Sequence, residues 1–475
     1  MIRFRTCLLW FALTILHTWF FFEESLGFNA LLFSVIVVTV LTWYHGLQKE
    51  KMWWYAACGH IVSSVAVAWH GTSESELVYY ISGFLLAGSV FAVRSSLPVA
   101  LLNGILGSFG VGFFAWLPDF FKTFKNRGAG SSAISLFTQR RAYLYAAPAG
   151  VTLIFYWFYS AANPDFFLNI DFPELNINFY LLSYFLLGGV LLCPLLFTWG
   201  LKNVVEWDSG KPDTLKRLRG KSRTFGKLGL KSENSQGVIM FSMLNILIII
   251  FLGFNVLQIF IPALVGERQN HSEQVHQGFE TLIISIVIAI LLIMYYFRAN
   301  QNFYSHKARL VRLATAWIVL NGLLALFTCY KNMLYVNHFG LTYKRIWVFI
   351  GIALTITGLL LTLSKIKDLK TNWYLVRQNS WVLYFMFCSY VLVDWDRLIT
   401  WYNPNYAELL DVEYIFGLGN SKIPYLRELV RNKDPRIMDY EDRIVFAKLG
   451  ISSRKNTWQS QTVDSQWLDR EIAAH

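Results

Sequence analysis

The stretch GVIMFSMLNILIIIFLGFNVLQIFIP, residues 237–262, carries no charged side chain. Because the hydrocarbon core of a bilayer is about 30 Å thick, about 20 apolar residues of α-helix are needed to cross it. The stretch therefore predicts a membrane-spanning helix. The whole chain agrees, since 55% of its 475 residues are hydrophobic, 15% are charged and the mean hydropathy is +0.41. This composition excludes an ordinary soluble protein, and 31 Gly, 11 Pro and 5 Cys exclude collagen-like, disordered and disulfide-rich classes.

Apolar runs bounded by charged or turn-forming residues recur along the first 395 residues. We predict an all-α fold, a polytopic transmembrane helix bundle followed by a small helical tail. The first run follows Arg3 and Arg5 but has no cleavage site of small residues, so we expect it to be retained as an anchor. The twelve candidate runs cover residues 6–22, 29–45, 53–69, 77–93, 97–116, 142–161, 178–199, 237–262, 279–297, 313–335, 345–364 and 379–395.

Lysine and arginine residues are concentrated in alternate loops between these runs. Membrane proteins keep an excess of Lys and Arg in their cytoplasmic loops, so the side of each loop can be inferred from their number. One set of loops holds 27 of these residues, and the other set holds three, Arg268, Lys344 and Arg345. The basic set comprises the N-terminus, residues 46–52, the flanks of run 97–116, and residues 200–236, 298–312 and 365–378.

The two sets alternate only if run 97–116 does not cross, because Arg94 and Lys122 flank it on the same side. Its four glycines, with Pro98 and Asn103, predict a weak helix typical of a re-entrant or interfacial element. We therefore predict eleven crossings, with the N-terminus in the cytoplasm; a crossing by run 97–116 would make twelve. The expected location is the inner (plasma) membrane, with residues 1–395 forming the bundle.

The remaining residues, 396–475, form a soluble tail in this interpretation. The tail contains 11 basic and 12 acidic side chains, so the net charge of +12 arises in the membrane part. Eleven crossings place the tail on the outer side. We expect a small cap of short helices packed against the bundle, with a looser terminus after about residue 450. The expected helix breaks are at Pro404, Gly417, Gly419, Pro424 and Pro435.

Three segments resemble a family of uncharacterised bacterial membrane proteins, the domain of unknown function 4173/4153 type. The first, YAAPAGVTLIFYWFYSAANPDF at 145–166, is similar to a signature span of that family. The second, VNHFGLTYKRIWVFIGI at 336–352, resembles its entry into a later helix, and the third, residues 396–429, resembles its C-terminal pattern. The residues that carry the resemblance are Pro148, Asn163, Pro164, Phe166, Gly340, Asn403, Asp411, Tyr414 and Pro424.

The resemblance covers roughly residues 140–430. Asn163 stands where many members of the family carry an acid, and Ile415 stands where Leu is usual. Membership in this family implies an integral inner-membrane protein of bacteria and implies no reaction.

Polar amides lie within the apolar runs, where buried polar groups mark either a polar pathway or contacts between helices. Asn245, Asn255 and Gln258 lie on similar faces of one predicted helix, and Asn321 lies near the middle of another. Such a stripe either lines a solute pathway or forms interhelical hydrogen bonds. Lys331 lies near a helix end, where a long charged side chain reaches the interface.

Motifs for catalysis, cofactors or metals are absent from the sequence. The histidines of HSEQVH, residues 271–276, are five positions apart, which does not place both on one helix face. His60 and His70 flank the third run on opposite sides and are not expected to share a metal, and Asp394 closes the last run near an interface. There is no nucleophile elbow, P-loop or dinucleotide fingerprint, and no cysteine pairs as C-x-x-C. We therefore expect no enzyme, no cofactor and no metal.

The loop at 200–236 holds nine basic residues, which favour contact with anionic lipid headgroups as well as a cytoplasmic location. The expected partner is the lipid bilayer, and no nucleic acid is expected. Few buried charges and a folded tail favour a membrane scaffold, or an envelope signalling or homeostasis component. Many spans, a glycine-rich discontinuity and a row of amides favour the alternative, a transporter or channel for a small solute.

Overall fold

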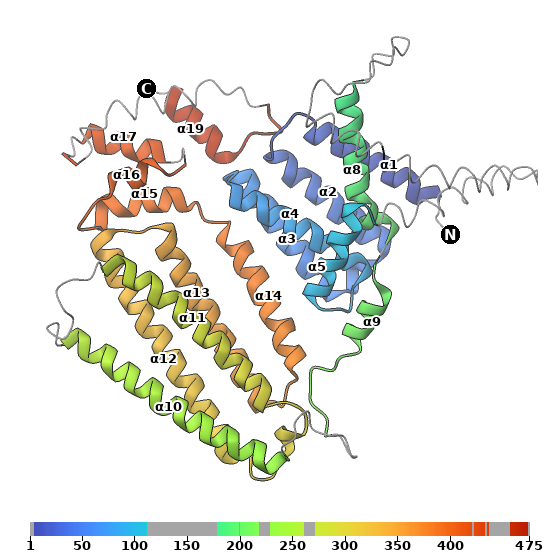
Figure 1. Cartoon of the computed structure of the whole chain (residues 1–475). Coiled ribbons are helices and arrows are strands. Elements are labelled where there is room, and N and C mark those ends of the chain that lie inside the picture. The colour runs from blue at the N-terminus through green and yellow to red at the C-terminus, as the bar shows by residue number, and fades with distance from the viewer. Residues whose placement is uncertain are drawn as a thin grey trace, which may run out of the picture.

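The computed structural model describes residues 4–111, 152, 178–198, 200–217, 229–260, 271–419, 422–432, 435–436 and 457–473. Every regular element within these ranges is a helix, which confirms the predicted all-α class for this part of the chain (Figure 1). Five of these helices are long and apolar enough to cross a membrane. They are α2 (Phe28–His45), α8 (Phe179–Phe197), α10 (Leu230–Phe260), α12 (Ala308–Phe339) and α13 (Tyr343–Lys367).

The other long helices of the bundle also coincide with predicted apolar runs, whereas run 142–161 lies outside the described residues except for residue 152. The last predicted run, 379–395, ends in the wrong place. Its helix stops at Tyr390, because the Asp394 carboxylate accepts a hydrogen bond from the Arg397 backbone N–H at 2.9 Å and so begins a new helix. The other long helices of the bundle are α1 (Phe4–Phe21), α3 (Lys51–Trp69), α4 (Ser73–Phe91), α5 (Leu97–Leu106), α11 (His271–Tyr296) and α14 (Asn372–Tyr390).

The turns between these helices collect at two ends of the bundle. We call one the tail end, which comprises residues 22–27, 70–72, 340–342 and 391–394. The opposite, basic end comprises residues 46–50, 92–96, 200–217, 297–307 and 368–371. The described basic residues of the Lys- and Arg-rich loops, such as Lys49, Arg94 and Lys370, lie at the basic end or in the helix turns beside it, and Lys344 and Arg345 lie at the tail end. Within the described residues, the two sets of loops thus lie at opposite ends of the bundle.

Helices α1 to α5 and α8 form one group around a shared apolar core. Helices α4 and α5 touch through their backbones, because a Cβ on Gly88 would lie 1.7 Å from the Ala100 carbonyl oxygen, and one on Gly104 would lie as close to the Phe84 oxygen. Small residues allow helices to approach this closely. Gly104 therefore serves packing. The glycines of run 97–116 do not prevent helix formation up to residue 111, where the last turn is a π-helix.

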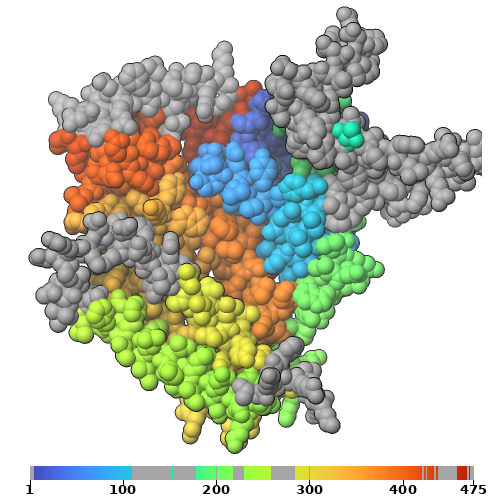
Figure 2. All heavy atoms as spheres, in the orientation of Figure 1, coloured from blue at the N-terminus to red at the C-terminus, as the bar shows by residue number. Residues whose placement is uncertain are grey.

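Helices α10 to α13 form a second group with its own apolar core. Helix α14 lies between the two groups, and its atoms fill the space between α5 and α11 in the space-filling view (Figure 2). Helix α10 exposes a broad apolar face, which includes Met243, Leu247 and Ile250. An apolar face of this kind is suited to a lipid environment.

The tail forms a cap of short helices across the tail end, as predicted (Figure 1). Two expected helix breaks are wrong: Pro404 lies inside the first of these helices, and Pro424 lies in the first turn of another, where its missing N–H needs no partner. The expectation of a looser terminus is wrong for residues 457–473. The described helices of the tail are α15 (Trp395–Tyr406), α16 (Val412–Phe416), α17 (Ile423–Arg431) and α19 (Val463–Ala473).

The final segment packs on the first helix group through its backbone. The N–H groups of Phe28 and Asn29 donate to the carbonyls of Gln461 and Gln459 at 3.1 and 3.0 Å. A Cβ on Gly27 would lie 2.5 Å from the Gln461 oxygen, so this turn requires glycine for the close approach. The C-terminal segment therefore packs beside the turn between α1 and α2 at the tail end.

Candidate functional site at the tail end of the bundle

The tail is held against the bundle by the turn between α12 and α13. Gly340 ends α12 with a φ of +79°, a conformation that favours glycine. Asn403 of α15 is buried beneath this turn, and its amide forms two hydrogen bonds with Leu341, accepting from the N–H at 2.5 Å and donating to the carbonyl at 3.0 Å. A Cβ on Gly340 would lie 2.7 Å from Asn403 Oδ1. The side chain of Asn403 can therefore occupy this position only because residue 340 is a glycine.

A second set of contacts fastens the start of α13 to the cap. The N–H of Tyr343 donates to the Tyr414 hydroxyl at 2.9 Å, and the Tyr343 hydroxyl donates to Asp396 Oδ1 at 2.8 Å. Asp396 Oδ2 accepts from the N–H of Gly419 at 2.9 Å. Asp411 accepts from the Tyr414 N–H at 2.9 Å and begins α16, so it positions the tyrosine.

Four residues that carry the family resemblance, Gly340, Asn403, Asp411 and Tyr414, thus meet in one interface. The side chain of Pro424 and the residues Pro148, Asn163, Pro164 and Phe166 lie outside the described part of the chain. The sequence placed these motifs in order along the chain, whereas the structure shows that the second and third segments pack on each other.

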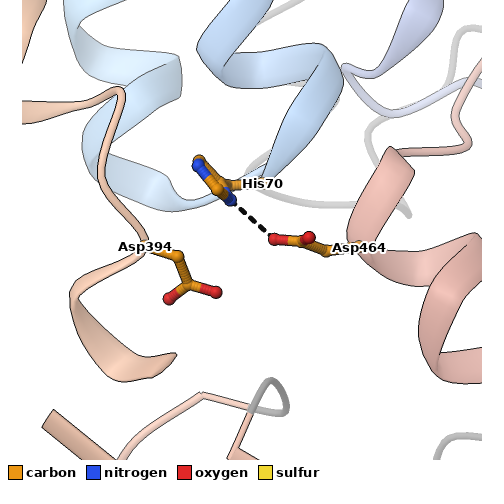
Figure 3. A group of neighbouring side chains, drawn as sticks. All are labelled: His70, Asp394 and Asp464. Atoms are coloured by element: carbon orange, nitrogen blue, oxygen red, sulfur yellow. Dashed lines mark hydrogen bonds and ion pairs between the residues drawn. The ribbon is translucent and has the colours of Figure 1, made fainter. Parts of the chain in front are cut away.

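Next to this interface, three possible metal ligands from three separate elements converge (Figure 3). His70 follows α3, Asp394 precedes α15, and Asp464 lies in the first turn of α19. His70 Nδ1 lies 2.6 Å from Asp464 Oδ2, and His70 Nε2 lies 3.1 Å from the Leu392 carbonyl oxygen. One ligand atom from each of the three side chains lies within 4.8 Å of the other two.

The electrostatics of this cluster favour a positive charge on or beside His70. Burial alone lowers the pKa of His70, but its bonds to Asp464 and the Leu392 carbonyl, with the charges of both carboxylates, raise that pKa above its ordinary value. Burial raises the pKa of Asp394. Arg397 lies nearby, donating from Nε to the Tyr425 hydroxyl at 2.9 Å, and this bond is the main cause of its raised pKa.

Sequence reasoning considered His70 only together with His60 and missed this cluster. Asp464 lies 394 residues further along the chain, so no local spacing connects the two. Asp394 was noted only as a charge near an interface. The one available signal was an ionisable residue at the end of each of two apolar runs that end on the same predicted side.

The predicted amides lie in the second helix group and make contacts typical of packing. Asn245 donates to the Leu313 carbonyl of α12 at 3.0 Å, and its buried Oδ1 has no hydrogen-bond partner among the described residues. Asn255 accepts from Lys331 Nζ at 2.9 Å, so the lysine binds across the two helices. Asn321 is buried and donates to a carbonyl of its own helix at 2.7 Å. The side chain of the fourth predicted residue, Gln258, lies outside the described part.

The first helix group contains a buried polar network that the sequence analysis overlooked. His60 lies at the middle of α3 and not at its flank, so the earlier placement is wrong. Its Nε2 lies 3.1 Å from Ser34 Oγ of α2, and its Nδ1 lies 2.9 Å from Ser82 Oγ of α4. Ser63 Oγ lies 2.8 Å from Ser82 Oγ, and Tyr79 stacks on the imidazole at 5.0 Å. The network therefore ties three helices together through one histidine.

The basic end is held by a buried carboxylate. Asp208, at the end of the short helix α9 (Lys202–Ser209), accepts hydrogen bonds from the Ser96 N–H and the Trp373 indole N–H, and its Oδ1 lies 3.4 Å from Arg377 Nη2. Asp208 thereby links the start of α5 to α14. The described basic residues of the 200–236 loop, such as Lys216, remain exposed around it.

These features define the chain as a helical protein with several helices suited to crossing a membrane and a cap docked at one end. Residues 10–429 match the family described as a domain of unknown function, DUF4153. The chain belongs to this family, which confirms the resemblance and extends it well before residue 140. No curated protein and no solved structure matches the chain.

Proposed function

We propose that this protein is a multi-pass scaffold, or envelope signalling or homeostasis component, of the bacterial inner membrane. In this proposal the chain crosses eleven times with its N-terminus in the cytoplasm, and it presents the cap on the outer side. The segregation of Lys and Arg at one end of the bundle supports this orientation, since such residues accumulate on the cytoplasmic side.

The observation that carries the proposal is the interface between the 340–342 turn and the cap. Asn403, Tyr414 and Asp396 each bond to a turn or helix start of the bundle, so the cap has a fixed orientation on the bundle. A rigidly held surface at one face of a membrane bundle is suited to binding another protein. The proposal assigns no catalytic reaction to the chain.

Anionic lipid headgroups are the proposed partners at the basic end. Lys202, Lys211, Lys216 and Arg217 are exposed there, and the exposed Trp207 carries Lys211 over its ring at 4.9 Å. Tryptophan is favoured at the level of the headgroups, and each nearby Lys or Arg contributes about 1 kcal/mol of attraction to an anionic surface.

A transporter or channel for a small solute is the second candidate. The observation that favours it is the polar contact between Asn255 and Lys331 of α12, within helices that are otherwise apolar. An ionisable group inside a membrane bundle is a functional hypothesis by default. The bond to Asn255 equally serves packing between α10 and α12.

Two substitutions distinguish the candidates in a host whose own copy of the gene is deleted. Asn403→Ala removes the two bonds to Leu341, and Asn255→Leu removes the partner of Lys331. Asn405→Ala is the matched control, because this exposed asparagine of the same helix donates only to the Trp401 carbonyl one turn earlier.

A scaffold predicts that Asn403→Ala fails to restore growth under envelope stress at normal protein abundance, whereas Asn405→Ala and Asn255→Leu restore it. A transporter predicts failure of Asn255→Leu alone. If Asn403→Ala lowers abundance, Tyr414→Phe serves instead, since it removes only the hydroxyl that accepts from Tyr343. Full complementation by both cap variants would refute the scaffold proposal.

A further inference from the structure

His70, Asp394 and Asp464 bring one nitrogen and two carboxylate oxygens from three separate elements within 4.8 Å of one another. Carbonyl oxygens only accept hydrogen bonds, so the contact of 3.1 Å with the Leu392 carbonyl places a proton on His70 Nε2. In a neutral imidazole Nδ1 then carries a lone pair. Nδ1 faces Asp464 Oδ2 at 2.6 Å, a hydrogen-bond distance, so one proton is shared between these two atoms. A metal ion bound by both atoms would replace this proton and move the two atoms apart.

We propose that these three side chains bind a divalent transition-metal ion of the zinc type. The arrangement has the features of such a site. Histidines that bind metals usually donate their second N–H to a carbonyl or carboxylate, as His70 does to Leu392, and this bond orients the free nitrogen toward the metal. One nitrogen and two carboxylate oxygens within 4.8 Å of one another supply three ligands, leaving the fourth position to water.

The choice of metal follows from the ligands. Imidazole suits Zn²⁺, whereas Mg²⁺ and Ca²⁺ prefer oxygen ligands alone. Arg397 does not occupy the position, because its guanidinium lies against the Trp467 ring at 4.8 Å and bonds to Tyr425.

The ion would join three distant parts of the chain. His70 belongs to the first helix group, Asp394 follows α14, and Asp464 belongs to the final helix. Metal binding to a site built from separate segments stabilises their association. The inference is independent of the proposed function, because its test measures metal binding directly.

The test uses the full chain in lipid nanodiscs, purified through a tag without histidine and stripped with EDTA. Zinc chloride is titrated in by calorimetry, and hydrogen exchange of residues 457–473 is followed with and without zinc. The variants are His70→Ala and Asp464→Asn. His338→Ala is the matched control, since this histidine also pairs through Nδ1 with a carboxylate, that of Glu408, at the same end.

We expect one zinc ion per chain, a loss of affinity of at least about tenfold in both site variants and none in His338→Ala, and slower exchange of residues 457–473 with zinc. If His70→Ala does not fold, His70→Gln and Asp394→Asn keep the shape of the site and replace it. A chain that binds no zinc would show that the position holds only a proton, and this outcome would overturn the proposal. Zinc binding that His338→Ala weakens as much as the site variants would also overturn it.

Discussion

Replacing His60 tests whether its polar network stabilises the first helix group. His60 is buried between Ser34 and Ser82, which belong to the two neighbouring helices. Each serine also has a carbonyl of its own helix as a second partner, that of Ala30 or Tyr79. Loss of the imidazole therefore leaves neither serine hydroxyl unpaired. The resulting change in the free energy of unfolding then measures the interhelical hydrogen bonds themselves.

Two variants separate the bonds from the volume of the ring. Interhelical hydrogen bonds in membrane proteins contribute about 0.6 kcal/mol each on average. His60→Leu keeps most of the volume and removes two bonds, so we expect a loss of about 1 kcal/mol. His60→Ala also leaves a cavity, which adds about 2–3 kcal/mol, for a total of about 3–4 kcal/mol.

The assay is the free energy of unfolding of the full chain in bicelles. Ser82→Ala should lose about 1 kcal/mol, because its hydroxyl contacts both His60 and Ser63. Ser89→Ala is the control, since this equally buried serine of α4 bonds only to the Leu86 carbonyl of its own helix. Equal losses for the two serine variants, or no loss for His60→Leu, would refute the reasoning.

Three further predictions concern packing and topology. Gly88→Ala should strongly destabilise the protein, because the added Cβ would lie 1.7 Å from the Ala100 carbonyl oxygen. Gly253→Ala should stabilise it by up to about 1 kcal/mol through helix propensity, because nothing lies within 4 Å of the added Cβ. Free energies of unfolding that change in the same direction for both variants would contradict this reasoning. Cysteines at Lys125 and Asn169 should react with impermeant reagents from opposite sides of the membrane, and labelling from one side would overturn the assigned loops. Alkaline phosphatase fused after His475 should be active, and green fluorescent protein fused at the same place should not fluoresce, because the tail is expected outside the cytoplasm. An inactive phosphatase fusion together with a fluorescent one would favour twelve crossings.

The positions of the long helices could be predicted from the sequence, and their ends could not. Apolar runs mark the part of a helix that needs an apolar environment, whereas the backbone hydrogen bonds continue beyond it. Helix α10 accordingly begins at Leu230, directly before the polar segment KSENSQ, and α11 begins at His271. Polar stretches that appear as loops in a hydropathy analysis are therefore turns of the same helices.

The candidate sites were harder to predict, for two different physical reasons. The cluster of His70 and Asp464 depends on a tertiary contact between residues 394 positions apart in the chain, which no local pattern contains. The network around His60 was available in the sequence, since a histidine lies at the centre of an apolar run. It was missed because its partners are serines, and single serines in apolar runs do not interrupt them.

Helix α14 explains how the cap and both helix groups act as one unit. At the basic end its Arg377 lies 3.4 Å from the buried Asp208, which also binds the start of α5. At its middle the Tyr384 hydroxyl donates to the Ala56 carbonyl of α3, and a Cβ on Gly59 would collide with that tyrosine. After its last turn the chain continues directly into the cap. Any displacement of one helix group relative to the other must therefore move α14, and through it the surface that the cap presents at the tail end.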